Sequence, residues 1–331
     1  MNETFKALVV RQDGKEFTRS IEQRNIDDLP KGDVLIRVHF SSLNYKDGLS
    51  CSGNRTVTRH YPHTPGIDAA GVVAFSCADD FKVGDSVIVI SHDLGANTSG
   101  GYGQYIRVPA DWVMPLPKGL DLRESMIYGT AGYSAGIALS VLQNQDITPK
   151  SGPIIVTGAT GGVGSVSVAL LAGLEYSVSA SSGKKNAKAF LNRLGVSEVI
   201  GREAVNDESG RTLLKEYWAG AIDSVGGNTL ATILKSTIKN GAVASVGLVS
   251  SSKLDTTVFP FILRGVNLKG VTTYGNSMAM RKDIWSKLAN EWKPKNLEHL
   301  ADDCSLENLN SKIDKIIAGD ILGRVVVDMQ S

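Results

Sequence analysis

Residues 154–164 read Ile-Ile-Val-Thr-Gly-Ala-Thr-Gly-Gly-Val-Gly. The apolar, β-branched start predicts a short buried strand at 154–157, and the apolar stretch at 163–174 predicts a helix. Glycines between them allow a tight turn, a close approach to a pyrophosphate and close packing of helix on strand. A phosphate there meets the free N–H groups that begin the helix. We therefore expect dinucleotide binding, although Ala159 replaces the usual first glycine and a purely structural turn is the alternative.

The sequence beyond this unit continues to alternate between strand-like and helix-like segments. Such alternation predicts βαβ units and an α/β fold with a doubly wound parallel sheet. The further strands are expected at 176–180, 221–223, 242–246 and 266–271, and the helices at 186–194 and 229–237.

The first third of the chain has a different pattern. Short β-branched or alternating runs at 34–40, 71–75 and 86–90 are separated by glycine- and proline-containing turns, which is typical of a compact, mostly antiparallel domain. The last stretch has a helical pattern followed by a strand at 324–328, and its length suits completion of this first domain.

The end of the second predicted strand bears on the choice of dinucleotide. NAD sites place a carboxylate there for the ribose hydroxyls. This chain has Ser181-Ser182-Gly183-Lys184-Lys185, whose hydroxyl and ammonium groups suit a 2′-phosphate. We expect NADP(H), with a solvated polar turn as the alternative.

Composition excludes several classes of partner. The chain has 331 residues, 35 Lys and Arg and 34 Asp and Glu, a net charge of +1 that predicts neither nucleic-acid nor membrane binding. The three cysteines, Cys51, Cys77 and Cys304, have no zinc or disulfide spacing. Residues 1–10 lack a signal-peptide pattern, and no apolar run is long enough to span a bilayer, so we expect a cytoplasmic protein.

Several motifs together resemble the medium-chain dehydrogenase/reductase superfamily. They are PGIDAAG at 65–71, VGDSV at 83–87, GTAGY at 129–133 and the loop at 159–164. Finer matches resemble its acryloyl-CoA reductase branch, which includes quinone-oxidoreductase-like proteins of the YhdH/YhfP type. These are LNYKD at 43–47, YPHTPGIDAAG at 61–71, residues 128–133 and FPFILRG at 259–265.

The resemblance also bears on metal binding. Zinc alcohol dehydrogenases of the superfamily have Cys and His ligands where this chain has Asn44 and Ile67. Isoleucine cannot bind zinc, and the four-cysteine structural lobe is absent as well, so we expect no zinc.

The resemblance implies a GroES-like catalytic domain at 1–123 and 276–331, a Rossmann NADP(H)-binding domain at 124–275, a homodimer and a small-molecule substrate. Tyr45 is expected near the nicotinamide, where it positions the ring or donates a proton. Asn44 either donates to the substrate oxygen or braces its loop. Thr273 stands where close relatives have serine. The expected cofactor contacts are Tyr45, Thr130, Ala159, Thr160, Gly161, Gly162, Val163, Gly164, Ser181, Ser182, Gly183, Lys184, Arg202, Leu248, Ile262, Thr273 and Arg324.

Three functions fit these expectations. The first is reduction of an enoyl thioester, acryloyl-CoA above all, by hydride transfer to the β-carbon and stabilisation of the charge on the thioester oxygen. The second is reduction of a quinone or enone by the same machinery. The third is non-catalytic NADPH binding, because fold alone does not decide function.

Overall fold

The computed structural model describes residues 3–331, and the chain divides into two compact units. The first unit comprises Met1–Thr130 and Ala301–Ser331, and the second comprises Ala131–Leu300. The expected division differed at both boundaries, because the structure groups 124–130 with the first unit and 276–300 with the second. No helix among the described residues is both long and apolar enough to cross a bilayer.

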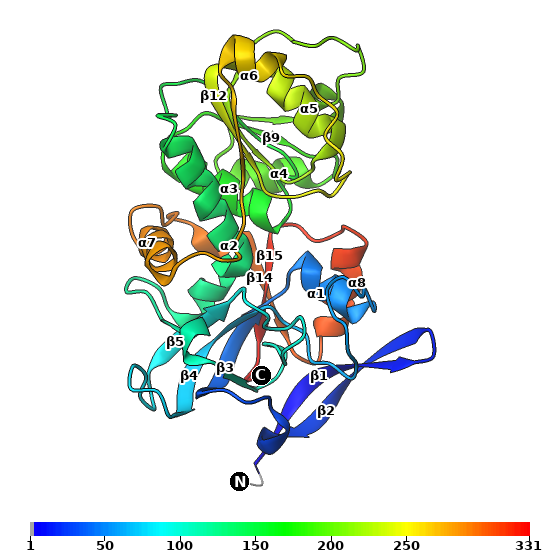
Figure 1. Ribbon diagram of the computed structural model, residues 1–331, viewed down its shortest axis with the longest axis vertical. Coiled ribbons are helices and arrows are strands. Elements are labelled where there is room, and N and C mark those ends of the chain that lie inside the picture. The colour runs from blue at the N-terminus through cyan, green and yellow to red at the C-terminus, as the bar shows by residue number, and fades with distance from the viewer. Residues whose placement is uncertain (1–2) are drawn as a thin grey trace. The chain divides into compact units, whose positions relative to one another are not determined.

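The first unit is built on a seven-stranded sheet with the order β14-β15-β3-β4-β5-β7, in which β6 also pairs with β3 (Figure 1). All its pairs are antiparallel except β14–β15, and β1 and β2 form a separate antiparallel hairpin. The strands are β1 (Thr4–Asp13), β2 (Glu16–Asn25), β3 (Val34–Ser42), β4 (Asp68–Ser76), β5 (Ser86–Ile90), β6 (Tyr105–Val108), β7 (Met114–Pro115), β14 (Ala301–Ser305) and β15 (Arg324–Asp328).

The C-terminal strand completes this sheet, as the sequence predicted. In β15, Val326 lies opposite Ser42 of β3, and the apolar side chains of β15 are buried in the core together with those of β3 and β5. Helices α1 (Tyr45–Cys51) and α8 (Leu309–Ile317) pack against each other. Helix α2 (Leu122–Gln143) is interrupted at Gly129, whose φ is 51°. Short 3₁₀ helices lie at Ile26–Asp28, Ala110–Trp112, Arg202–Val205 and Leu297–Leu300.

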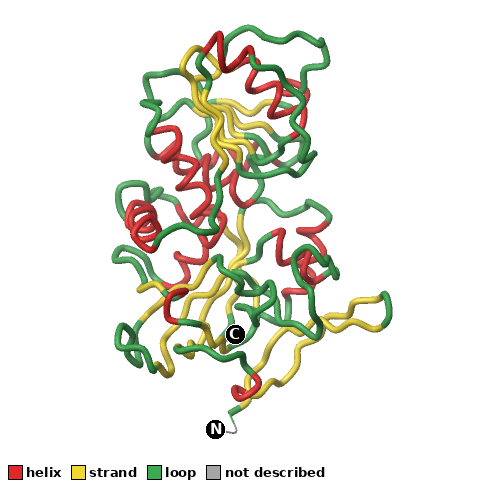
Figure 2. The backbone as a smooth tube through the Cα atoms, in the orientation of Figure 1, coloured by secondary structure: helices red, strands yellow, loops and turns green. Residues whose placement is uncertain are grey.

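The second unit contains a six-stranded parallel sheet with the order β10-β9-β8-β11-β12-β13, which confirms the predicted doubly wound fold. Figure 2 shows these strands side by side, with helices and loops around them. The strands are β8 (Ile154–Val156), β9 (Val178–Ser181), β10 (Glu198–Ile200), β11 (Trp218–Asp223), β12 (Thr237–Ser245) and β13 (Asn267–Gly270). The helices are α3 (Gly162–Gly173), α4 (Ala187–Arg193), α5 (Gly227–Ser236), α6 (Phe259–Arg264) and α7 (Met278–Ala289).

The strand order fixes where a ligand can bind. From β8 the chain first builds outward through β9 and β10, and it later returns to the other side of β8 with β11. Ligands of doubly wound sheets bind at the carboxyl ends of the strands at such a switch point, which here lies between β8 and β11.

Gly164 allows α3 to pack closely on the turn after β8. A Cβ atom at this position would lie 2.3 Å from the Gly158 carbonyl oxygen, which belongs to the backbone and cannot rotate away. We predict that Gly164→Ala lowers the free energy of unfolding by about 1–3 kcal/mol, the usual cost of overpacking. Gly173→Ala on the same helix is the matched control, since its Cβ would meet only Pro294 Cα at 3.9 Å. If urea unfolding showed an equal loss of unfolding free energy in Gly164→Ala and Gly173→Ala, the packing argument would be contradicted.

Candidate active site

The turn between β8 and α3 has the geometry of a phosphate-binding loop. Gly158 has a φ of 57°, in the left-handed region that favours glycine, and its carbonyl accepts a 2.8 Å hydrogen bond from the Gly161 amide. Helix α3 then begins at Gly162. The predicted contacts from Ala159 to Gly164 all lie in this turn or in the first turn of the helix, where N–H groups lack partners within the helix.

The residues expected to bind a 2′-phosphate lie close together. The Thr160 and Ser182 hydroxyl oxygens are 3.3 Å apart, and the Lys184 amide donates to the Ser182 hydroxyl over 3.3 Å. A Cβ on Gly183 would lie 2.6 Å from Arg202 Nε, so the Arg202 guanidinium covers that glycine. Tertiary structure therefore places Arg202 beside the serine and lysine residues that the sequence had grouped.

A buried carboxylate at the switch point was missed by the sequence reasoning. Asp223, the last residue of β11, is fully buried and accepts hydrogen bonds from the Thr157 hydroxyl (2.5 Å) and the Gly226 amide (2.8 Å). The Ser224 hydroxyl donates to the Thr157 carbonyl over 2.9 Å. Burial raises the pKa of Asp223. These contacts tie together the carboxyl ends of β8 and β11, and the only signal in the sequence was a polar residue at a strand end.

In the first unit, Asn44 uses both ends of its side-chain amide within the protein. The amide nitrogen donates to Asp68 Oδ2 over 2.8 Å, and the amide oxygen accepts from Arg324 Nη1 over 3.3 Å. Of the two roles expected for Asn44, these contacts favour bracing of the loop over direct donation to a substrate.

Arg324 lies in the interior rather than at the surface. Its side chain is 2% exposed, and its guanidinium donates to Ser42 Oγ (2.8 Å), Asn44 Oδ1 (3.3 Å) and the carbonyls of Leu43 (3.1 Å) and Ile127 (3.0 Å). Protein acceptors therefore surround the cation, and the cofactor contact expected of Arg324 stays a prediction.

Asp68 is the centre of the same network and was also missed as a site residue. Its carboxylate accepts from Ser42 Oγ (2.5 Å) and from both the amide (3.0 Å) and the hydroxyl (2.5 Å) of Thr130. A Cβ on Gly129 would lie 2.4 Å from Asp68 Oδ2, so the interruption of α2 brings its backbone against the carboxylate. Thr130, an expected cofactor contact, therefore makes hydrogen bonds within the protein through both groups.

Asp47 provides a second buried carboxyl group. It accepts from the backbone amides of Asn44 (2.8 Å) and Ile67 (2.9 Å), and it forms a capping box at the start of α1. Burial, followed by repulsion from Asp68, raises its pKa to about 6.

Other predicted residues present exposed side chains. Tyr45, the first residue of α1, is 53% exposed, and Leu248 and Ile262 are exposed as well. Thr273 follows β13 and is partly buried, and its carbonyl accepts a 3.1 Å hydrogen bond from Arg281. The Tyr45 side chain is exposed, which distinguishes it from the buried Asn44 and Arg324.

Comparison with known proteins identifies the family. Residues 30–118 match the alcohol dehydrogenase GroES-like domain, and residues 162–290 match the family described as zinc-binding dehydrogenase. The acrylyl-CoA reductase AcuI of Ruegeria pomeroyi is 40% identical over 329 residues, which cover 99% of this chain and 100% of that protein. The chain belongs to the medium-chain dehydrogenase/reductase family.

Solved structures place this medium-chain reductase in the YhdH/YhfP branch. YhfP of Bacillus subtilis with NAD bound is 40% identical and superposes with a TM-score of 0.95 over 98% of this chain and 99% of that chain. YhdH of Salmonella enterica in complex with NADP is 39% identical, with a TM-score of 0.94 and the same coverage. The sequence resemblance to this branch is thereby confirmed.

One matched family is described as zinc-binding, but the residues of this medium-chain reductase do not form a zinc site. Ile67 offers no ligand atom, and the Asn44 amide and the Asp68 carboxylate are hydrogen-bonded to each other. Across residues 3–331, no group of three or more His, Cys, Asp or Glu side chains is placed to hold a metal ion.

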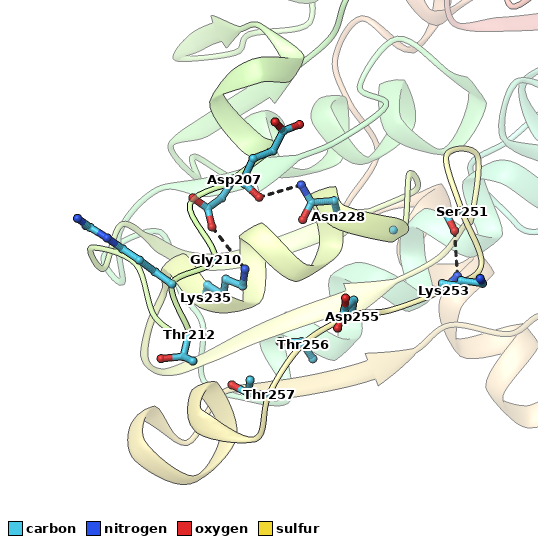
Figure 3. Close-up of a pocket in the computed structure, with 13 residues that line it drawn as sticks. Asp207, Gly210, Thr212, Asn228, Lys235, Ser251, Lys253, Asp255, Thr256 and Thr257 are labelled. Atoms are coloured by element: carbon cyan, nitrogen blue, oxygen red, sulfur yellow. Dashed lines mark hydrogen bonds and ion pairs between the residues drawn. The ribbon is translucent and has the colours of Figure 1, made fainter.

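The second unit also contains a cavity of about 560 Å³ (Figure 3). It is lined by parts of 207–212, α5 and 251–257. Asp207 and Lys235 form an ion pair of 3.4 Å in it, and Asn228 donates to the Asp207 carbonyl over 2.9 Å. None of the expected cofactor contacts lines this cavity, so we do not include it in the active site.

Asp47 predicts a specific pH dependence of stability. Its pKa is about 6 in the folded protein and about 3.9 in an unfolded chain, so the folded state binds the proton more tightly. Stability should therefore fall as the pH rises through 6, by about 1.4 kcal/mol from this group between pH 5 and pH 8. Chemical denaturation at both pH values should show this loss in the wild type and not in Asp47→Asn. Equal losses in the two proteins would assign the pH dependence to other groups.

Proposed function

We propose that the chain is an NADPH-dependent oxidoreductase that reduces the conjugated double bond of an enoyl thioester, with acryloyl-CoA, reduced to propanoyl-CoA, as the preferred substrate. The observation that carries the proposal is the cluster of Thr160, Ser182, Lys184 and Arg202 beside the glycine turn. The near full-length similarity to an acrylyl-CoA reductase supports the choice of substrate.

The residues fit a phosphorylated dinucleotide. The first turn of α3 would hold the pyrophosphate, and Ser182, Lys184 and Arg202 would hold the 2′-phosphate. Among the YhdH/YhfP relatives, two YhdH structures carry NADP or NADPH and the YhfP structure carries NAD, so the argument for NADPH rests on these side chains. When bound, NADPH supplies the hydride.

We propose that Tyr45 is the residue nearest the chemistry. Conjugate reduction develops negative charge on the thioester oxygen and needs a proton at the α-carbon. The exposed Tyr45 hydroxyl either positions the nicotinamide ring or donates this proton, while the amide of Asn44 braces the loop. A Tyr45→Phe enzyme with unchanged turnover would exclude the proton-donor role.

The test is NADPH oxidation by the purified protein with acryloyl-CoA, with NADH and a benzoquinone in parallel. We expect NADPH-selective turnover of acryloyl-CoA. Turnover of the quinone alone would favour quinone reduction, and NADPH binding without turnover would favour a binding protein.

Lys184→Ala should lower kcat/KM for NADPH by about 10- to 100-fold, because a hydrogen bond to a charged group contributes about 1.5–3 kcal/mol. The value for NADH should stay unchanged. Lys188→Ala, on the exposed face of the neighbouring α4, is the matched control. An equal loss of kcat/KM with NADPH and with NADH would show that Lys184 does not bind the 2′-phosphate.

We also propose a homodimer in the cytoplasm. Strand β13 forms one edge of its sheet, and Val258, Ile262 and Leu263, in or next to α6, are exposed apolar side chains. Exposed apolar surface of this kind is typical of interfaces. Light scattering during size-exclusion chromatography should give twice the chain mass of 35.2 kDa, and a monomer at micromolar concentration would contradict the proposal.

A further inference from the structure

Arg281 is a buried cation outside the clusters described above. It is the fourth residue of α7, and its side chain is 5% exposed. Burial lowers its pKa. Burial of a charge costs free energy unless hydrogen bonds compensate it. The hydrogen-bond partners of the guanidinium therefore indicate which part of the structure Arg281 stabilises.

The Arg281 guanidinium holds both ends of one turn. Nη2 donates to the Thr273 carbonyl over 3.1 Å, and Nε donates to the Asn276 carbonyl over 3.3 Å. Gly275, the third residue of the four-residue turn 273–276, has a φ of 72°, in the left-handed region that favours glycine. The planar guanidinium presents several donors in a fixed fork, which suits two carbonyls at a set separation better than an ammonium group does.

Tyr133 of α2 holds the same turn from another side. Its hydroxyl accepts a 3.1 Å hydrogen bond from the Asn276 amide, which also donates to the Thr272 carbonyl over 2.9 Å. The Tyr133 ring is fully buried, and its centroid lies 5.6 Å from Arg281 Cζ. The turn is thereby fixed to two helices, while Tyr274 at its tip is 54% exposed.

The position of the turn points to a ligand. It begins three residues after Gly270, the last residue of β13, so it lies on the side of the carboxyl ends of the parallel strands, where ligands of doubly wound folds bind. Resting on the proposed function, we propose that Arg281 is a positioning residue that clamps turn 273–276 and so fixes one wall of the NADPH site. The clamp sets cofactor affinity, whereas the reacting atoms are held elsewhere.

The test compares Arg281→Met and Arg281→Lys with Lys282→Met, an exposed neighbour on the same helix, as the matched control. Hydrogen exchange without cofactor should show amides 273–276 exchanging about tenfold faster in Arg281→Met, because the local opening is no longer resisted. The Kd for NADPH, followed by its fluorescence, should rise about tenfold, because a loop that is no longer held in place must be ordered when the cofactor binds. For Arg281→Lys, the exchange rate and the Kd should lie between those of Arg281→Met and the wild type. All variants should retain their kcat at saturating NADPH.

The outcomes separate this proposal from the proposed function. A wild-type protein that does not bind NADPH would overturn the proposed function and the clamp with it. A wild type that binds NADPH, with Arg281→Met folded and its Kd unchanged, would overturn the clamp alone, even if thermal stability fell. If Arg281→Met does not fold, Asn276→Ala removes the second tether of the turn, and an unchanged Kd together with unchanged exchange in that variant would equally overturn it.

Discussion

The Arg324 guanidinium lies in the interior of the first unit, where its charge interacts with two buried carboxyl groups, Asp68 and Asp47. One cation lies beside two acids. Burial, followed by repulsion from Asp68, raises the pKa of Asp47 to about 6. The hydrogen bonds of this network join β15, the end of β3, the start of β4 and the interruption of α2. Loss of the guanidinium would leave the buried carboxyl groups with their hydrogen-bond donors but without a cation beside them, which is why the local structure of this unit depends on it.

The second unit fixes the loops at the carboxyl ends of its strands with close backbone contacts and with two buried ionisable side chains. Gly158 and Gly164 bring backbone close to backbone at the turn before α3, and Asp223 joins the ends of β8 and β11 through the Thr157 hydroxyl. Arg281 then fixes the turn after β13. All three devices act at the carboxyl edge of the sheet, so the rigidity of this unit is concentrated where a dinucleotide would bind.

In the first unit, exposure to solvent distinguishes Tyr45 from the residues that hold one another in place. Tyr45 is exposed, whereas Asn44 is buried and is hydrogen-bonded to both Asp68 and Arg324. Asn44 immediately precedes Tyr45 at the start of α1, so bracing Asn44 also restrains the exposed tyrosine. When hydrogen bonds already hold polar groups in place before a reaction, less free energy is needed to rearrange those groups during it.

Patterns that are local in the chain determined much of this protein from the sequence alone. Alternating strands and helices predicted the doubly wound sheet, and residues 154–164 predicted the position of the phosphate turn, because backbone conformation and amphipathicity are encoded within a few residues. The burial of Arg324, the roles of Asp68 and Asp223 and the clamp by Arg281 were decided only by tertiary structure. Arg324 and Asn44 are 280 positions apart, and Thr157 and Asp223 are 66 apart. From the sequence alone, a polar residue at a strand end is interpreted as exposed to water. Only the tertiary structure shows that its partner lies within hydrogen-bonding distance and that both are shielded from water.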